Sequence, residues 1–391
     1  MLIHHWPRGS LPTNCLWSAH SQCAILGEWA KARKKRQIAL VGTMKLLGEE
    51  AVIPASAVGD EPFVSMVLPL FNGEQYLREC IAHIAALDYP ISRRELLIVD
   101  GASTDASAGL ARTLLDEYGL TGAVITNPAR TISSNLNVGL DTASGPLLCR
   151  VDVKSRIPST YLRDATELLA TRPELSWVGG GTVALPSKPR TMALGIARAH
   201  NNPVVMGGAK YQYRRESGGA DTVYLGVGRI DALRAVNGWG TDLLMNEDYD
   251  LCQRLGGADA VWFDDRLTVG WMAPANASTL LGRYQGFGRS KVKYWRTRGE
   301  RPAPRQMALL GLPVPFLAVA AGLTRRGSVP TLLTIGTTGA LGGLLAIDNA
   351  YGPTESATIA ERLAAALVAA PLIGGGWLSG VFLEALFPED Q

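Results

Sequence analysis

The sequence has few of the residues on which many catalytic and metal sites depend. It contains five cysteines and five histidines among 391 residues. The cysteines are widely spaced and form no Cys-x-x-Cys pair, so they indicate neither a disulfide framework nor a zinc site and fit a reducing, cytosolic environment. Only His83 and His200 lie outside the first 20 residues, and neither belongs to a recognisable catalytic pattern. A carboxylate is therefore the first candidate for a catalytic base.

A strong excess of one charge is also missing. Lysine and arginine number 38 against 35 aspartates and glutamates, which gives a formal net charge of +3. Nucleic-acid-binding domains usually carry a basic stripe on one folded face, and the central region has none, so no nucleic-acid partner is expected. Hydrophobic residues make up 47% of the chain, enough for a sizeable core in one large or two ordinary domains.

The first 60 residues differ from the rest because they contain no strand-like run. A basic cluster at 31–36 is followed only by a short apolar stretch at 38–41, so the hydrophobic region of a secretory signal is missing. One interpretation is a disordered tail, and a second is a start codon placed upstream of a true start at Met44. A third is a basic helix lying on anionic lipid. The first two are favoured.

From Phe63 the pattern becomes regular. Apolar runs predict strands, and apolar residues at helical spacing predict the helices between them. The expected strands are 64–70, 95–99, 122–126 and 146–151, and the expected helices are 74–87, 105–118 and 133–142. This alternation indicates an α/β fold with a mostly parallel sheet covered on both faces. Ligands bind at the carboxyl ends of such strands, where Asp100 and Asp152 both fall.

The last part of the chain is apolar. Three runs at 307–323, 329–347 and 363–382 are almost uncharged, and each comes near the roughly 20 residues that a membrane-spanning helix needs. Buried core helices are the alternative, but three runs in succession favour membrane helices. Arginines and lysines between 289 and 305 precede the first run, which places that flank in the cytoplasm by the positive-inside tendency. The predicted organisation is an N-terminal extension (1–60), a catalytic domain (61–300) and a C-terminal membrane-associated region (301–391).

The segment 99–105 reads Val-Asp-Gly-Ala-Ser-Thr-Asp and follows a predicted strand. Asp100 could accept hydrogen bonds from a uracil or ribose, and Gly101 lets the chain turn close to the base. The structural alternative is a turn with a helix cap, in which Ser103 or Thr104 caps the helix and Asp105 lies in its first turn. The two interpretations are compatible.

The segment 246–255 brings three carboxylates to the start of another predicted helix. As structure alone, Glu247 and Asp248 would complement the helix dipole while Leu251 and Leu255 pack inward at i, i+4 spacing. As chemistry, a base fixed at the start of a helix is well oriented to remove a proton. Asp250 is expected to be structural.

These segments, together with Leu68-Pro-Leu-Phe-Asn-Gly-Glu74, resemble the signatures of the inverting family 2 glycosyltransferases. Within that family the sequence is most similar to the bacterial succinoglycan and exopolysaccharide glucosyltransferase group, from Val64 to about Ser290. The resemblance implies a GT-A fold, which is a Rossmann-like sheet that binds a nucleotide sugar. It also implies a set of donor-binding residues: Pro69, Leu70, Asn72, Glu74, Asp100, Ser103, Arg130, Asn137, Asp152 and Lys154.

Two of these residues belong to the family element under the donor diphosphate. Arg130 could pair with phosphate oxygens in bidentate geometry, and Asn137 could fix the loop that carries it. Without the resemblance, the same residues would read as a surface arginine and a helix-terminal asparagine.

The segment 150–154, Arg-Val-Asp-Val-Lys, occupies the position of the family's Asp-x-Asp metal motif. Asp152 can be a ligand of a divalent metal ion, Mg²⁺ or Mn²⁺, that stabilises the departing nucleotide. Lys154 cannot, because an ammonium group offers donors and no acceptor. The metal is then held by Asp152, the diphosphate, water and another carboxylate, or Lys154 itself neutralises the leaving group. Metal dependence is the expectation.

The resemblance assigns the acceptor side to the second half of the domain. Asp248 is the implied base and Glu247 a neighbour that positions the acceptor. Trp239 offers a flat face for a sugar ring, and Gly238 permits close backbone approach. Processive members carry Gln-x-x-Arg-Trp where this chain has Gln285, with Gly288 at the arginine position and Arg289 one residue later. Gln285 and Arg289 would contact the diphosphate or an anionic lipid carrier; a solvated basic helix face is the equal alternative.

The predicted function is transfer of a single sugar, with inversion, from a UDP-sugar to a lipid-linked saccharide in surface or extracellular polysaccharide synthesis. The enzyme would lie at the cytoplasmic membrane with its catalytic domain facing the cytosol. One alternative is a processive polysaccharide synthase, and another is a catalytically idle nucleotide-sugar-binding membrane subunit. Basic and aromatic residues between 210 and 215 could line the acceptor entrance.

Overall fold

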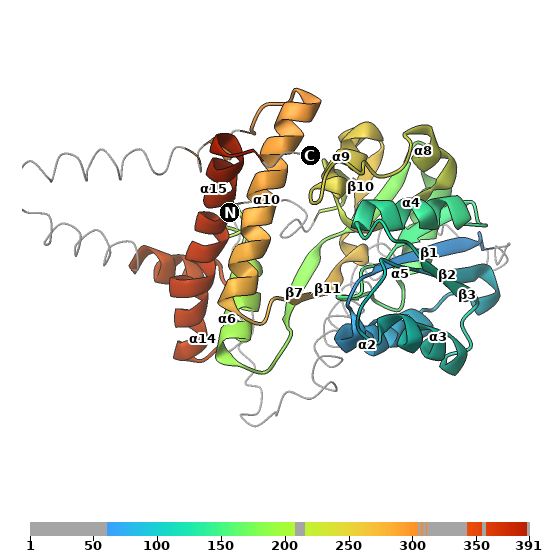
Figure 1. Cartoon of the computed structure of the whole chain (residues 1–391), viewed down its shortest axis with the longest axis horizontal. Helices are drawn as coiled ribbons and strands as arrows, with labels where there is room; N and C mark the ends of the chain where they lie inside the picture. The colour runs from blue at the N-terminus through green and yellow to red at the C-terminus, as the bar shows by residue number, and fades with distance from the viewer. Residues whose placement is uncertain are drawn as a thin grey trace, which may run out of the picture. The chain divides into compact units, whose positions relative to one another are not determined.

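The computed structural model describes residues 61–207, 216–303, 306–307, 310, 342–353 and 357–388 (Figure 1). The chain divides into the units 1–60 and 61–391, and every described residue belongs to the second unit. The N-terminal extension, the possible acceptor entrance at 210–215 and most of the first two apolar runs lie outside the described residues.

The first half of the domain alternates strands and helices as predicted. Its strands are β1 (Val64–Leu70), β2 (Arg94–Asp100), β3 (Gly122–Thr126) and β4 (Leu147–Arg150). Its helices are α2 (Glu74–Ala85), α3 (Ser107–Glu117) and α4 (Ile132–Thr142), with a short 3₁₀ turn η2 (Ile91–Arg93) before β2. The four strands are parallel in the order β3-β2-β1-β4. The chain leaves β1 toward β2 on one side and returns to β4 on the other, which is the arrangement that opens a ligand crevice at the carboxyl edge.

The second half extends the same sheet and adds a smaller one. Strands β9 (Tyr224–Arg229), β6 (Trp177–Gly180), β10 (Val261–Phe263) and β8 (Gly218–Gly219) continue the main sheet after β4, and β9 is antiparallel to both of its neighbours. Strands β5 (Ser155–Arg156), β11 (Val269–Ala273) and β7 (Thr182–Pro186) form the second sheet. The helices here are α5 (Tyr161–Thr171), α6 (Thr191–His200), α8 (Ile230–Ala235) and α9 (Glu247–Arg254), with 3₁₀ turns η3 (Gly257–Asp259) and η4 (Asp265–Leu267).

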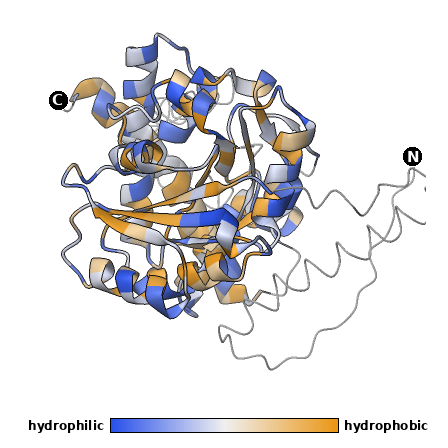
Figure 2. Ribbon diagram, turned by 90° about the vertical axis from the view of Figure 1, so that its right-hand side faces the viewer, coloured by the Kyte–Doolittle hydropathy of each residue, from blue (hydrophilic) through white to orange (hydrophobic). Residues whose placement is uncertain are grey.

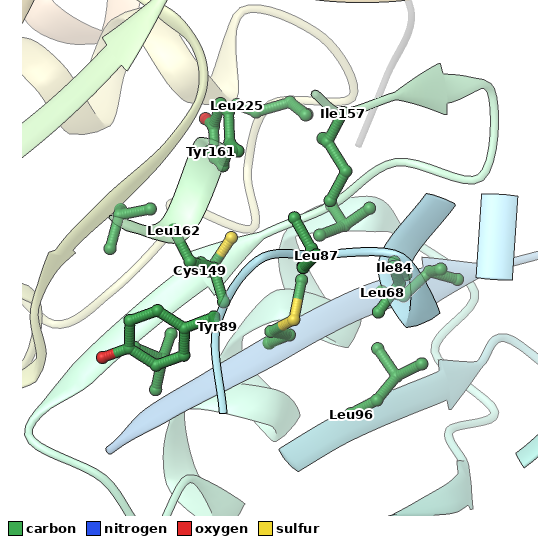
Figure 3. Packing of buried hydrophobic residues seen from close by; sticks show 14 of the residues in the cluster. Leu68, Ile84, Leu87, Tyr89, Leu96, Cys149, Ile157, Tyr161, Leu162 and Leu225 are labelled. Atoms are coloured by element: carbon green, nitrogen blue, oxygen red, sulfur yellow. The ribbon is translucent and has the colours of Figure 1, made fainter. Parts of the chain in front are cut away.

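The main sheet is buried on both faces because its strands present apolar side chains alternately to each side. On β1, Met66 and Leu68 pack with α2, α3 and α5, whereas Val67 packs with α4, α8 and α9. Figure 3 shows part of the first of these clusters, including Leu68, Ile84 and Cys149. Figure 2 shows the same pattern across the domain, with hydrophobic strands between helices whose outward faces are more hydrophilic. This core fixes the loops at the carboxyl edge of the sheet.

Helix α10 (Ala277–Arg298) leads away from the sheets and runs beside α15 (Ala370–Leu386) (Figure 1). The segment before α15 consists of α14 (Ile359–Leu363) and a π-helical turn, η5 (Ala364–Ala369). Glycines let α10 and α15 approach with their backbones nearly in contact. A Cβ atom on Gly288 would lie 2.2 Å from the carbonyl oxygen of Trp377, and one on Gly380 would lie 2.1 Å from that of Gln285. Any side chain at either position would force the helices apart.

Among the described residues, one helix, Ile359–Leu386, is long and apolar enough to cross a membrane. It contains the third predicted apolar run, and 33% of its most apolar window is buried against the rest of the unit. A core helix of a soluble protein would pass the same test. The membrane region of the chain therefore rests, in the described part, on this one helix.

A buried histidine fixes α10 against α6. The Nδ1 atom of His200 donates to the carbonyl oxygen of Ile196 at 2.9 Å, which leaves Nε2 to accept from the hydroxyl of Tyr284 at 3.1 Å. The ring also lies 5.3 Å from that of Trp271. Burial lowers the pKa of His200 to about 4, and the positive charge of Arg283 acts in the same direction. The neutral imidazole is therefore part of the packing of α10 against α6 and β11.

We expect this histidine to make the protein less stable in mild acid. In the unfolded chain a histidine titrates near pH 6.5. Below that pH, His200 is therefore protonated in the unfolded state but stays neutral in the folded state. The stabilising effect is complete above pH 6.5 and is lost as pH falls toward 4. For this residue alone the free energy of unfolding should drop by about 2 kcal/mol between pH 7 and pH 5. Urea unfolding of His200→Gln at both pH values should show a smaller drop than the unmodified protein, and an identical drop would contradict the prediction.

Candidate active site

The loops at the carboxyl edge of the main sheet carry most of the left-handed backbone found at non-glycine residues. The φ angle is 48° at Asn72, 56° at Ala102, 61° at Arg130 and 66° at Asn246. These residues follow β1, β2 and β3 or precede α9. Such conformations cost free energy and persist where the surrounding structure imposes them, which is common at functional sites. The strain therefore marks the same edge that the sequence pattern indicates.

The loops after β1 and β2 are tied together by polar groups. The side-chain oxygen of Asn72 accepts from the backbone N–H of Thr104 at 2.8 Å, and the backbone N–H of Asn72 donates to the Ser103 hydroxyl at 2.9 Å. The buried carboxylate of Asp100 accepts from the N–H of Ser103 at 3.2 Å. Asp100 thus lies at the base of a rigid double loop, where it was predicted to meet the nucleotide, and Pro69 is half-buried at the end of β1.

The helix-capping part of the sequence interpretation needs correction. Ser103 and Thr104 do not cap α3; instead Asp105 accepts from the N–H of Ser107 at 3.0 Å and Glu74 accepts from that of Ala106 at 3.2 Å. Glu74 therefore has a structural task at the start of α3. Leu70 is also mainly structural, because its side chain is 1% exposed in the core and only its carbonyl, bonded to the N–H of Gly101 at 2.7 Å, faces the loops.

Two asparagines hold the loop that carries Arg130. The amide of Asn127 donates to Ser134 at 2.8 Å and to Asn135 at 2.9 Å, and Asn135 in turn donates to the carbonyl of Val99 at 3.1 Å. Arg130 is exposed at the tip of this loop, and no acidic side chain among the described residues forms a salt bridge with it. Its guanidinium is therefore available to an anionic ligand.

Asn137, which was predicted to fix the Arg130 loop, acts elsewhere. Its amide donates to the carbonyl of Trp239 at 2.8 Å, and its oxygen accepts from the N–H of the same residue at 2.8 Å. It thereby anchors the segment of Gly238, whose φ is 62°. The sequence interpretation failed because the partner lies 102 positions away in the chain.

The centre of the site is a buried arginine that the sequence interpretation left without a role. Arg150 ends β4 with 3% of its side chain exposed and pairs with three carboxylates. Its Nε lies 3.0 Å from Oδ1 of Asp152, its Nη2 lies 3.2 Å from Oε1 of Glu247, and its Nη1 contacts Oδ1 of Asp248. Burial alone would lower the pKa of Arg150, but the charges of Asp152 and Glu247 raise it well above its usual value. Arg150 therefore joins the end of β4 to the start of α9 as a permanent cation.

The three carboxylates of α9 are placed differently. The side chain of Asp248 is 31% exposed and that of Glu247 only 8%. Asp250 is buried, and its two oxygens accept from Arg254 at 2.8 Å and from Arg298 at 2.7 Å. Asp248 is thus the one that can reach a bound acceptor. Asp250 joins α9 to α10, in agreement with its expected structural role.

The residues present do not fit the predicted metal site. Both carboxylate oxygens of Asp152 accept from Arg150, Oδ1 from Nε at 3.0 Å and Oδ2 from Nη2 at 3.4 Å. Lys154 occupies the position where the motif has its second aspartate. Among the described residues, no group of three or more His, Cys, Asp or Glu side chains could hold a metal ion. Hard divalent cations need several oxygen ligands, and a site with two neighbouring cations opposes their binding. We therefore derive no catalytic step through a metal.

Lys154 lies between aromatic and cationic neighbours. Its ammonium nitrogen is 5.2 Å from the centre of the Tyr76 ring. Burial lowers the pKa of Lys154, the charge of Arg283 lowers it further, and Asp152 opposes both effects. Arg283 comes from the first turns of α10, so that helix contributes to the site.

Of the predicted acceptor residues, Trp239 is placed where a sugar cannot stack on it. Trp239 is 1% exposed and packs edge-on against Trp177 with the ring centres 6.0 Å apart, so its faces are covered by the core. The amide of Gln285 donates to Ser379 at 3.2 Å, and Arg289 lies 3.8 Å from Glu384. Both belong to the contact between α10 and α15. The predicted stacking face of Trp239 is therefore wrong, whereas the contacts of Gln285 and Arg289 with the diphosphate or an anionic lipid carrier stay predictions.

Comparisons with known proteins identify a glycosyltransferase with this fold. Residues 65–197 match the model of the family described as "Glycosyl transferase family 2". The succinoglycan biosynthesis protein ExoA of Rhizobium meliloti (strain 1021) is 27% identical over 328 residues, which are 82% of this chain and 94% of that protein.

A second relative, from Methanococcus voltae, is a dolichyl N-acetyl-alpha-D-glucosaminyl phosphate 3-beta-D-2,3-diacetamido-2,3-dideoxy-beta-D-glucuronosyltransferase. It is 26% identical over 170 residues, which are 42% of this chain and 52% of that protein. Among solved structures, the mannosyltransferase PcManGT from Pyrobaculum calidifontis, in complex with GDP-Man and Mn²⁺, superposes with a TM-score of 0.58. It is 18% identical and the match covers 85% of this chain and 89% of that one, so it shows a shared fold.

Proposed function

We propose that this chain, a glycosyltransferase with a family 2 domain in a GT-A fold, transfers one sugar with inversion from a UDP-sugar to a lipid-linked saccharide. Asp248 removes the proton of the acceptor hydroxyl, and the resulting oxygen attacks the anomeric carbon. The bond from that carbon to the diphosphate oxygen breaks on the opposite face, and UDP leaves with the bonding electrons.

The observation that best supports this proposal is the Arg150 cluster. Through one guanidinium, Asp248 on α9 is held beside Asp152 at the end of β4, the position at which the family binds the donor diphosphate. An inverting reaction needs a base and a leaving group on opposite sides of one anomeric carbon, and a shared rigid partner keeps their separation constant. Glu247 acts through Arg150 as a positioning residue.

The donor nucleotide is assigned to the double loop around Asp100. Asp100 and Ser103 face the uracil or ribose, Asn72 holds their loops together, and Arg130 reaches the diphosphate from its exposed loop. The uridine assignment rests on the hydrogen-bond acceptors that Asp100 supplies, since the N3–H of uracil and the hydroxyls of ribose are donors.

Two observations support a lipid-linked saccharide acceptor. The similar protein ExoA is named for succinoglycan biosynthesis, and the Methanococcus relative is named for a sugar carried on dolichyl phosphate. The helix Ile359–Leu386 would hold the enzyme at the cytoplasmic membrane with its site in the cytosol. Phe382 and Leu386, exposed by 47% and 69%, lie on that helix and are suited to lipid contact.

Addition of a single sugar is favoured over processive synthesis by the packing of α10. Processive members carry an arginine where this chain has Gly288, and a Cβ there would lie 2.2 Å from the carbonyl oxygen of Trp377. The arginine is thus incompatible with the contact between α10 and α15. Products analysed by mass should carry one added sugar, whereas a ladder of longer products would support the processive alternative.

We expect UDP-sugars to stabilise the protein in a panel of nucleotide sugars screened by thermal unfolding. A ligand at 100 times its dissociation constant should add about 2.7 kcal/mol to the free energy of unfolding. Asp100→Asn should lose most of this gain, because one charged acceptor is removed from the nucleoside pocket. Asp116→Asn, an exposed change on α3, is the matched control and should keep it. Stabilisation by GDP-sugars alone would contradict the uridine assignment.

A further inference from the structure

Two half-buried cations, Lys154 and Arg283, have no carboxylate partner among the described residues, unlike Arg150, Arg156 and Arg198. The guanidinium of Arg283 lies 4.8 Å from the ring centre of Trp271 and 5.0 Å from that of Phe287, and the ammonium of Lys154 lies over Tyr76. No acidic side chain among the described residues lies within 4.0 Å of either group, whereas Arg150, Arg156 and Arg198 all have one. Aromatic faces hold these two charges without neutralising them.

The fold brings the two cations together from distant parts of the chain. The carbonyl of Lys154 accepts from the N–H of Met272 at 2.9 Å, and the next residue, Ser155, pairs with Trp271 between β5 and β11. Arg283 stacks on that same Trp271, and the charge of Arg283 reaches Lys154. Two like charges held close together repel unless an anion binds between them.

The position of Arg283 is set by the packing of α10 directly after it. Tyr284, the next residue, is bonded to His200, and α10 packs along α15 through Gly288. An arginine in solvent has no packing contacts that would hold its guanidinium in one place. Here the guanidinium is held by the packing of Tyr284 and by stacking on Trp271, which pairs with Ser155 next to Lys154.

We propose that Lys154 and Arg283 bind the diphosphate of the donor and neutralise the charge that forms on it as the sugar leaves, so that donor binding needs no divalent cation. This inference rests on the proposed transferase function. When the anomeric C–O bond breaks, its electron pair passes to a phosphate oxygen; the two side chains supply the positive charge that a metal supplies in other enzymes. Arg283 offers paired N–H groups and Lys154 a point charge.

The test is the binding of UDP, UMP and inorganic pyrophosphate to the full-length protein by calorimetry, in excess chelator and in Mn²⁺. The unmodified protein should bind UDP with dissociation constants in the two buffers that agree within about twofold, well below the tenfold that 1.4 kcal/mol represents. Lys154→Met and Arg283→Met should each weaken UDP by about tenfold or more and UMP much less, because the second phosphate is the group they meet. Lys188→Met, an exposed lysine beyond β7, is the matched control and should change nothing.

A third variant makes the test sharper. Lys154→Asp restores an Asp-x-Asp pair, so it should bind UDP poorly in chelator and recover affinity in Mn²⁺. If the unmodified protein binds UDP only with Mn²⁺, or if both methionine variants bind UDP normally, the inference is wrong while the transferase proposal stands. If UDP fails to bind but pyrophosphate binds without metal and loses affinity in Lys154→Met, the uridine donor is wrong and the cation pair stands. If neither binds in any buffer, both are overturned.

Discussion

Replacing Asp248 by asparagine should lower the rate of sugar transfer by about 10²- to 10⁴-fold, the range expected when a general base is removed. Asparagine keeps the shape of the side chain and can still place an oxygen against Arg150, but it cannot take the acceptor proton. The dissociation constant for UDP should change by less than about threefold, since Asp248 is assigned to the acceptor side. The measurement is single-turnover transfer together with calorimetric UDP binding on the same preparation.

Asp250→Asn is the control for this experiment because it makes the same chemical change on the same helix. The oxygens of Asp250 face Arg254 and Arg298, so this variant should lose stability and keep its transfer rate per folded molecule. Glu247→Gln should fall between the two, as Glu247 acts only through Arg150. If Asp248→Asn retained normal turnover, or if Asp250→Asn lost as much, the base would have to be sought elsewhere.

The fold could be predicted from the sequence because its strands are apolar runs with clear ends. The expected strands 64–70 and 122–126 coincide with β1 and β3, and the expected helices differ from α2, α3 and α4 by a few residues at their ends. Local periodicity determines these elements, and parallel strands bring their carboxyl ends to one edge. The positions of Asp100 and Asp152 follow from that rule without knowledge of any long-range contact.

Predictions that required a side-chain environment were less secure. Trp239 looked like a sugar platform, but its burial depends on Trp177 across the second half of the sheet. Asn137 was assigned to a loop next to it in the chain, whereas its partner is 102 positions away. Glycines flanking a tryptophan are compatible with an open platform and with a tight turn over a core, and sequence alone does not separate the two.

The positions of the cations in the site also depend on parts of the chain that are far away in the sequence. An arginine that ends an otherwise apolar strand, as Arg150 does, is a signal that could have been noticed, since burying it requires carboxylates nearby. Which carboxylates these are depends on α9, 97 positions later. Arg283 gave no local signal, because its place beside Lys154 depends on how α10 packs against α6 and α15.

Arg150→Met should be the most damaging single change in the domain. It removes the partner of the buried Glu247 and leaves that carboxylate without compensation, which typically costs about 3–5 kcal/mol of stability. It also frees Asp152 and Asp248 from their shared partner, so transfer by the remaining folded protein should fall by about 10²-fold or more. Urea unfolding and single-turnover transfer would measure the two effects separately.

The ion pair of Arg198 with Asp348 provides a control of the same burial without the same chemistry. Its partners are 7% and 6% exposed and 2.8 Å apart, and it joins α6 to the segment around residue 348 rather than to any site residue. Arg198→Met should therefore destabilise the protein by a similar amount and keep transfer per folded molecule. An equal loss of transfer in this variant would mean that the effect of Arg150→Met comes from stability alone.

The double variant Arg150→Met with Glu247→Gln distinguishes the two tasks of the arginine. Glutamine removes the unpaired buried charge, so part of the lost stability should return, as expected for residues that interact directly. Transfer should not return, because Asp152 and Asp248 are still without the group that fixes their separation. If stability and transfer recovered together, Arg150 would be only a counter-ion for Glu247, and the alignment of base and leaving group would have to depend on α9 itself.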